Sequence, residues 1–200
     1  MRQAIKQLVL ASNNPGKVAE LSDLLASLDI EVIPQSAFDV VDIEETGTTF
    51  VENAILKAKY TSKVTGLPAL ADDSGLVVPC LNGAPGIYSA RYAGEPKSDR
   101  RNNDKLLREL AGKENRKAAF VCVMVLCLSD THPLPIITEG IWQGEISEIA
   151  HGDGGFGYDP LFYVPTHKMT AAEMDKAEKN RISHRAKATQ SLLTQLTMLM

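Results

Sequence analysis

The stretch LPALADDSGLVVP, residues 67–79, places two adjacent aspartates between two apolar segments. The apolar residues predict a short buried strand over 67–71 and a neighbouring strand within 74–83, with a turn at Ser74-Gly75. Charged side chains are rarely buried unless they are paired or bind a metal. Asp72 and Asp73 therefore indicate a functional site at a strand end, which is where α/β proteins place ligands.

Strand and helix patterns alternate on both sides of this stretch. The further predicted strands cover residues 7–12, 31–35, 118–128, 135–147 and 161–165. The predicted helices cover residues 13–28, 49–66 and 98–111 and the C-terminal segment. Because strands and helices are interspersed, we expect an α/β or mixed α+β fold.

The composition argues against several classes of protein. The chain has 200 residues, of which 44% are hydrophobic and 23% are charged, as in an ordinary globular domain. A formal net charge of -4 argues against nucleic acid or an anionic membrane as a partner. The longest apolar run, residues 118–128, is shorter than the ~20 residues of a spanning helix, and the N-terminus lacks a signal-peptide pattern. We therefore expect a cytoplasmic protein.

The segment SNNPGK, residues 12–17, joins the first strand to the first helix. Asn14 can cap that helix, and proline suits the position after it. A helix N-terminus that follows a strand can bind phosphate, and an anion there would stabilise Lys17 in the first turn. A helix cap beside a solvated lysine explains the same residues, so the segment by itself leaves both interpretations open.

Acidic residues suggest a metal. Glu44 and Glu45 precede the helix at 49–66, where either could be a surface charge. Consecutive strand residues point to opposite faces, so Asp72 and Asp73 can share one site only if the turn after them redirects the chain. The set of Glu45 and both aspartates suits Mg²⁺, which prefers carboxylates, phosphates and waters. Capping of the turn is the alternative role for the aspartates.

Three further segments carry polar or aromatic groups. Lys57 shares a face of the helix at 49–66 with Asn53, and a solvated face is the ordinary explanation. The loop GGFGYDP, residues 154–160, could hold a flat ring or form a structural glycine turn. The segment EKNRISHRAKA, residues 178–188, adds a basic cluster at the start of the last helix. Together these signals indicate phosphates, Mg²⁺ and an aromatic ring.

Five ordered segments resemble one known family. They are SNNPGKVAE (12–20), EETGTTFVENAILKA (44–58), ADDSGLVVPCLNGAPGIYSARYAG (71–94), GGFGYDPLF (154–162) and ISHR (182–185). In order and spacing they look like the signatures of the noncanonical purine NTP pyrophosphatases, which include dITP/XTP pyrophosphatases and inosine triphosphatases. The resemblance extends from about residue 8 to the last helix.

The resemblance implies a fold and an activity. The implied fold is a long mixed β-sheet with flanking helices, forming two lobes around a central cleft within a single domain over residues 1–200. The implied reaction is Mg²⁺-dependent cleavage of the α–β phosphate bond of ITP, dITP or XTP by a homodimer, giving the monophosphate and pyrophosphate.

The resemblance also implies roles for individual residues. Glu45 and Asp73 would hold Mg²⁺, and Asp73 would activate the attacking water. His184 and Arg185 would donate hydrogen bonds to the 6-oxo group that hypoxanthine and xanthine carry. The full set of implied substrate-binding residues is Ser12, Asn13, Asn14, Pro15, Gly16, Lys17, Lys57, Ser74, Phe156, Gly157, Tyr158, Asp159, Lys179, His184 and Arg185.

Two alternatives remain open at this stage. A house-cleaning pyrophosphatase for modified pyrimidine or methylated nucleotides would need the same metal and phosphate groups. A non-enzymatic nucleotide- or RNA-binding module would use the basic residues, but it would not need Glu45 and Asp73.

Overall fold

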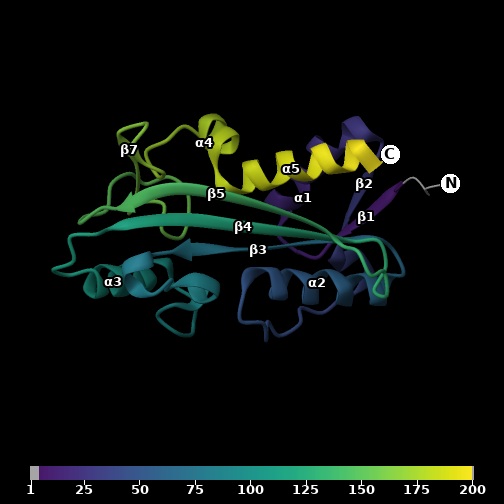
Figure 1. Cartoon of the computed structure of the whole chain (residues 1–200), viewed down its shortest axis with the longest axis horizontal. Helices are drawn as coiled ribbons and strands as arrows, with labels where there is room; N and C mark the ends of the chain where they lie inside the picture. Colours follow the sequence, from purple (N-terminus) through teal and green to yellow (C-terminus); the bar gives the residue numbers. More distant parts are fainter. Residues whose placement is uncertain (1–4, 200) are drawn as a thin grey trace. The chain divides into compact units, whose positions relative to one another are not determined.

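The structure is a computed structural model that describes residues 5–199, apart from the side chains of Pro15, Glu20, Asp23, Leu24, Ser27 and Leu199. Its sheet has the strand order β2-β1-β3-β4-β5-β6-β7 (Figure 1). The strands are β1 (Gln7–Leu10), β2 (Glu31–Pro34), β3 (Ala69–Val77), β4 (Lys117–Cys127), β5 (Ile136–Ile146), β6 (Phe162–Val164) and β7 (Met169–Thr170). The helices are α1 (Pro15–Leu25), α2 (Phe50–Thr65), α3 (Asp99–Glu109), α4 (Lys176–Ile182) and α5 (His184–Leu199). The predicted mixed α/β class is confirmed.

The chain divides into two compact units. Unit 1 comprises residues 1–73, 123–139 and 188–200, and unit 2 comprises residues 74–122 and 140–187. Strand β1 pairs in parallel with β2 and β3, whereas β6 pairs antiparallel with β5 and β7. The sheet is therefore mixed.

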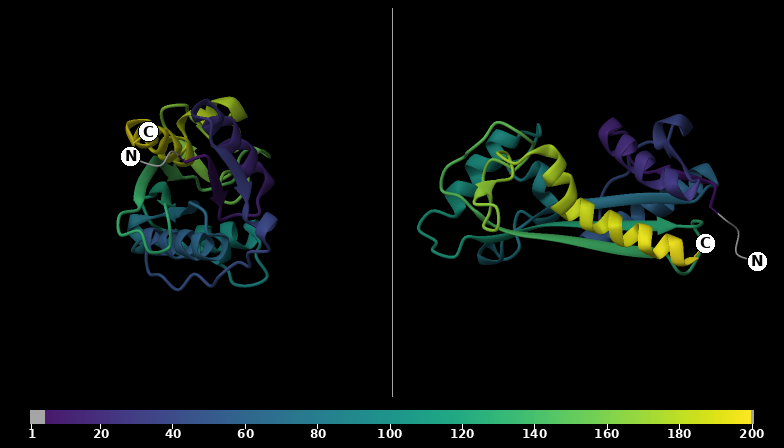
Figure 2. Two further views of the ribbon diagram at one scale, coloured as in Figure 1. Left: turned by 90° about the vertical axis from the view of Figure 1, so that its right-hand side faces the viewer. Right: turned by 90° about the horizontal axis from the view of Figure 1, so that it is seen from above.

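In unit 1, two crossover connections determine where the helices lie. The chain passes from β1 through α1 to β2 and returns through α2 to β3, on the other side of β1. Right-handed crossovers taken in opposite directions across a sheet place their helices on opposite faces. Figures 1 and 2 show α1 and α2 on opposite faces of these strands.

Helix α2 has strong start and stop signals in the sequence. Thr49 accepts from the backbone N–H of Glu52, and the Glu52 carboxylate accepts from the N–H of Thr49, which forms a reciprocal capping box. Gly66 ends the helix with a φ of 69°, a left-handed conformation that glycine adopts without steric cost. Ala54 and Ala58 are fully buried. The helix predicted over 49–66 is confirmed.

Strand β3 corrects the predicted turn at Ser74-Gly75. The strand runs without interruption from Ala69 to Val77, so the two predicted strands are one. Its pattern is buried at almost every position, which a strand covered on both faces requires. The buried Asp72 and Asp73 are tolerated inside this strand because each carboxylate is paired with a lysine, as described below.

Unit 2 has its own apolar core, built around aromatic side chains. Phe120 packs against Phe162 with ring centroids 4.6 Å apart, and Trp142 packs against Phe162 at 5.1 Å. Leu106 and Leu110, at the C-terminal end of α3, are fully buried in the same cluster. Strand β5 alternates between buried and exposed residues and β4 is buried almost throughout, as their sequence patterns predict.

The basic C-terminal segment contains two helices. Helix α4 ends at Ile182 and α5 begins at His184. Ser183 between them is buried and extended, and its hydroxyl accepts from the backbone N–H of Ala186. Serine is a favoured N-cap, so Ser183 starts a new helix. Among the described residues, no helix has the length and apolar character needed to cross a membrane.

Candidate active site

The predicted site residues fall into two groups that belong to different units. The group in unit 1 contains the segment 12–17 with Glu45, Lys57 and Asp73. The group in unit 2 contains Ser74, the loop 156–159, Lys179, His184 and Arg185. Each group is described by itself.

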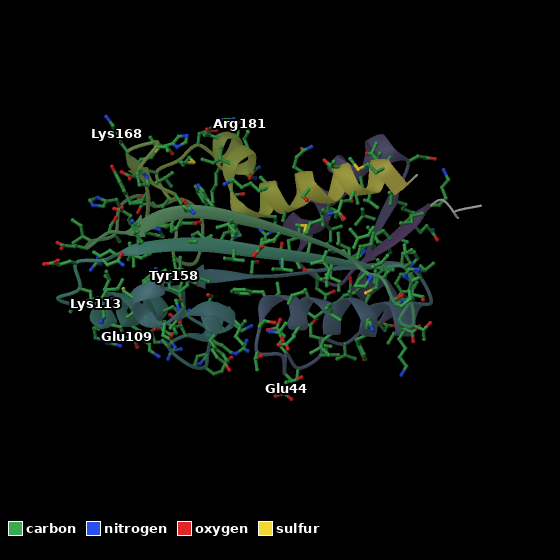
Figure 3. All side chains as sticks on the ribbon, in the orientation of Figure 1. Glu44, Glu109, Lys113, Tyr158, Lys168 and Arg181 are labelled. Atoms are coloured by element: carbon green, nitrogen blue, oxygen red, sulfur yellow. The ribbon has the colours of Figure 1, made fainter. Side chains whose placement is uncertain are left out.

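Lys57 brings the two predicted metal ligands together. Its ammonium donates to Glu45 Oε1 at 2.9 Å, to Asp73 Oδ1 at 3.1 Å and to the backbone carbonyl of Asp72 at 2.8 Å. Glu45 is half-buried, whereas Glu44 is exposed and lies at the outer margin of the loop before α2 (Figure 3). The contact with Lys57 therefore distinguishes Glu45 from Glu44, a choice that the family resemblance implied but that the local residue pattern left open.

Burial and charge act on the pKa values of this cluster. Burial raises the pKa of the Asp73 carboxyl, and the nearby charge of Glu45 adds to the rise while Lys57 opposes it. Burial by itself would lower the pKa of Lys57, but Asp73, Glu45 and Asp72 outweigh burial, so the pKa lies above its usual value. Lys57 is therefore a cation, and the Asp73 carboxyl group has a higher proton affinity than an ordinary aspartate.

Asn53 is a site residue that the sequence pattern misassigned to a solvated face. It is completely buried, and its Nδ2 donates to Asp73 Oδ2 at 3.4 Å. Its Oδ1 accepts from the backbone N–H of Gly47 at 2.8 Å, which ties down the loop that carries Glu45. A Cβ at Gly47 would lie 2.6 Å from Asn53 Oδ1, so this contact requires glycine there. Asn53 therefore positions both predicted metal ligands.

Asp72 binds a different cation from Asp73. Lys17 Nζ contacts both carboxylate oxygens of Asp72, at 2.7 and 2.8 Å. The two aspartates occupy consecutive positions of β3, and their cationic partners come from α1 and α2 on opposite faces. The Asp72 carboxylate therefore lies beside Lys17, whereas the carboxylates of Glu45 and Asp73 both contact Lys57. Among the described residues, no group of three or more His, Cys, Asp or Glu side chains has the arrangement of a metal site.

The segment 12–17 forms the predicted helix cap. Asn14 Oδ1 accepts from the N–H groups of Gly16 at 2.9 Å and Lys17 at 3.3 Å, and Ser12 Oγ accepts from the N–H of Asn14 at 3.2 Å. Asn13 is exposed, and the side chain of Pro15 is outside the described set. The N–H groups expected to face a phosphate are thus bound by Asn14.

In unit 2, the loop 154–160 exposes one aromatic ring and buries its other large side chains. Phe156 is 68% exposed, whereas Tyr158 and Asp159 are buried. The Tyr158 hydroxyl donates to the Ser89 carbonyl at 2.8 Å, and Asp159 Oδ2 accepts from the N–H of Phe156 at 2.8 Å. Tyr158 and Asp159 therefore shape the loop from inside.

The basic residues of this group lie in two different surroundings. Lys179, in α4, pairs with the buried Asp159 and lies 5.0 Å from the centroid of the Phe156 ring. His184, at the start of α5, stacks on Phe120 with ring centroids 5.0 Å apart and an interplanar angle of 14°. Arg185 is half-buried in the first turn of α5, and Ser74 is half-buried within β3. Lys179 thus contacts the loop that carries Phe156, whereas His184 contacts the aromatic core through Phe120.

Gly155 provides a test of how tightly this loop is built. Its φ of 75° is left-handed, and a Cβ there would overlap the Asp159 carboxylate. Gly155→Ala should combine the backbone cost of about 1–2 kcal/mol with overpacking of about 1–3 kcal/mol. Gly112→Ala is the matched control, because Gly112 has a φ of 73° and open space around its Cβ position. Equal losses of unfolding free energy in urea would contradict the tight packing against Asp159.

The fold and the two groups define a class of protein: a mixed α/β protein with a half-buried carboxylate–lysine cluster in one unit and an exposed aromatic ring beside a lysine in the other. The profile of the Ham1 family matches residues 8–195. The chain belongs to the Ham1 family.

Several relatives share nearly the whole chain. A Coxiella burnetii protein named dITP/XTP pyrophosphatase is 53% identical over 193 residues, which cover 96% of each chain. An Erwinia tasmaniensis protein of the same name is 56% identical over 191 residues, covering 94% of this chain and 93% of the relative. The solved structure of a HAM1 protein from Coxiella burnetii has a TM-score of 0.95 at 52% identity and covers 97% of this chain and 100% of its own. The Staphylococcus aureus Ham1 protein has a TM-score of 0.92 at 45% identity, with 98% and 100% covered.

Proposed function

We propose that this chain is a nucleoside triphosphate pyrophosphohydrolase that cleaves the α–β phosphate bond of ITP, dITP and XTP. The products are the nucleoside monophosphate and pyrophosphate, so the enzyme removes noncanonical purines from the nucleotide pool. The observation that carries this proposal is the convergence of the Glu45 and Asp73 carboxylates on one half-buried ammonium, that of Lys57. The name dITP/XTP pyrophosphatase, which relatives at 53–56% identity carry, supports the choice of substrate.

We infer that Glu45 and Asp73 would hold Mg²⁺. Their oxygens are the ligand type that Mg²⁺ prefers, and two carboxylates are enough because this ion keeps several waters and takes phosphate oxygens as further ligands. When bound, Mg²⁺ would neutralise phosphate charge and lower the pKa of the attacking water. Asn53 supports this assignment because it holds Asp73 and, through Gly47, the loop of Glu45.

In the proposed mechanism, Asp73 is the general base. Its raised pKa makes it a better proton acceptor than an ordinary aspartate, provided that it is ionised at the working pH. Lys57 lies beside Asp73, where its charge can stabilise the negative charge that develops on the phosphate oxygens. Lys17, oriented by both oxygens of Asp72, would bind the triphosphate together with the segment 12–17.

The second group is proposed to bind the base. The exposed Phe156 ring offers a stacking surface, and Lys179, which pairs with Asp159, lies 5.0 Å from its centroid. His184 and Arg185 would donate to the 6-oxo group, while adenine would place an amino donor against the same donors. Ser74 would contact the substrate, as the resemblance implies. We further propose that the enzyme is a cytoplasmic homodimer that does not bind nucleic acid or membranes.

The proposed activity is tested with a substrate panel. Pyrophosphate release should be measured for ITP, dITP, XTP, GTP, ATP and a methylated pyrimidine triphosphate, each in excess Mg²⁺ and in EDTA. We expect kcat/KM for the first three to exceed that for ATP by at least about 100-fold, because buried donors reject a base that presents another donor. EDTA should abolish release. Preference for the pyrimidine would favour the house-cleaning alternative, and binding without hydrolysis would favour a non-enzymatic module.

A further inference from the structure

Both backbone polar groups of Gly157 are held by side chains of α3. Asp99 Oδ2 accepts from the N–H of Gly157 at 2.7 Å, and Asn103 Nδ2 donates to its carbonyl at 2.9 Å. Asp99 and Asn103 are four residues apart, so they lie on one face of the helix. The two peptide groups on either side of the Gly157 Cα are therefore fixed by one rigid element.

These two contacts determine the orientation of the residue before Gly157. The N–H that Asp99 binds belongs to the peptide group joining Phe156 to Gly157. Phe156 is 68% exposed, so packing contributes little to the position of its ring. Its own N–H is held by Asp159 from inside the loop. Hydrogen bonds to the backbone on both sides of Phe156 therefore fix the position of this residue, which core packing would do for a buried side chain.

Helix α3 is anchored in unit 2 and can therefore hold this loop in a fixed position. Ser98 caps its N-terminus, and Leu106 and Leu110 lie in the core of unit 2. Asn102, buried next to Asn103, accepts from the N–H of Ala93 at 2.7 Å and donates to the Ser89 carbonyl at 3.3 Å. The helix is therefore anchored at both ends and along its side, so a shift of Gly157 would break contacts rather than move the helix.

We propose that Asp99 and Asn103 are positioning residues that set the orientation of the Phe156 ring, and thereby the enzyme's affinity for the base but not for the triphosphate. This inference rests on the proposed function, in which Phe156 stacks on the base. Neither residue needs to contact the substrate. Losing one contact should allow the peptide before Gly157 to rotate, so that the ring leaves its stacking position for part of the time.

The test compares two ligands of which only one carries the base. Inosine monophosphate reports on the base site, and inorganic tripolyphosphate, as a competitive inhibitor of ITP hydrolysis, reports on the phosphate site. We expect Asp99→Ala and Asn103→Leu each to weaken inosine monophosphate binding about 3–10-fold, as the loss of one hydrogen bond implies. The inhibition constant of tripolyphosphate should stay within about twofold of wild type, since no phosphate ligand has moved.

Two further variants separate positioning from general damage. Asp99→Asn retains an oxygen that can accept from Gly157, so it should recover most of the affinity for inosine monophosphate. Asp104→Ala, an exposed change on the same helix, should change neither ligand's binding. Equal weakening of both ligands would overturn the inference by showing a structural role, as would unchanged binding of inosine monophosphate. Hydrolysis of ITP by the wild type tests the proposed function separately, and its absence would overturn both.

Discussion

Asp73→Asn should lower kcat by about 10²–10⁴-fold while the protein remains folded and still binds the nucleotide. The substitution keeps the size of the side chain and an oxygen that can accept from Asn53, but it removes the charge that we propose accepts a proton and binds Mg²⁺. Asp73 is 9% exposed, and its charge is balanced by Lys57 at 3.1 Å. Single-turnover rates with ITP, together with inosine monophosphate affinity and far-UV circular dichroism, measure the three parts of this expectation.

Asp72→Asn is the matched control for this experiment. Asp72 is adjacent in β3 and 7% exposed, and it is also paired with a lysine, but that lysine is Lys17 rather than Lys57. Neutralising Asp72 should loosen Lys17 and mainly raise KM for the triphosphate, with a smaller loss of kcat. If Asp73→Asn kept more than about a tenth of the wild-type kcat, the general base would have to lie elsewhere.

Arg185→Ala should narrow the preference for ITP over ATP by about 10–100-fold in kcat/KM. The interaction that we propose is lost is a charge-assisted hydrogen bond to the 6-oxo group, on the order of 1.5–3 kcal/mol, which ATP would not make. Arg185 lies in the first turn of α5, where a cation opposes the helix dipole, so an acceptor on the ligand would offset that unfavourable placement. The measurement is kcat/KM for ITP, XTP, GTP and ATP in wild type and variant.

Lys187→Ala provides the comparison for Arg185. It removes a cation two residues further along α5, where Lys187 is exposed and donates to the carbonyl of Ile141 at 2.7 Å. We expect no change in the ITP to ATP ratio. A uniform fall of kcat/KM across all four nucleotides in Arg185→Ala would place Arg185 on the phosphates or in the scaffold, and the account of specificity would then be wrong.

The elements that sequence patterns predicted well are those whose determinants are local. The helix over 49–66 has its N-cap at Thr49 and its C-cap at Gly66, both within one turn of the helix ends. The continuous apolar pattern of β4 likewise indicates a strand buried on both faces, and the alternation in β5 indicates a strand buried on one face. The predicted turn at Ser74-Gly75 was wrong because serine and glycine, although common in turns, can also occupy a strand whose backbone is paired with neighbouring strands.

The residue types of the site were evident from sequence, and their partners were not. The segments that carry the family resemblance contain the acidic residues Glu45, Asp72 and Asp73 and the basic residues Lys17 and Lys57. The profile of the Ham1 family matches almost the whole chain. Asn53 offered only its position on the polar face of a predicted helix. Its complete burial against Asp73 depends on how β3 packs against α2, which no local pattern reports.

By itself, therefore, the sequence determined the class of fold, the ends of the capped helix and the kinds of chemical group available, because these depend on residues close together in the chain. Only the tertiary structure decided that Asp72 pairs with Lys17 and Asp73 with Lys57, across separations of 55 and 16 residues. It likewise decided that α3 holds Gly157, through contacts spanning 54 and 58 residues. Hydrogen bonds and ion pairs act over a few ångströms, so such partners are determined by which elements the packed chain brings into contact.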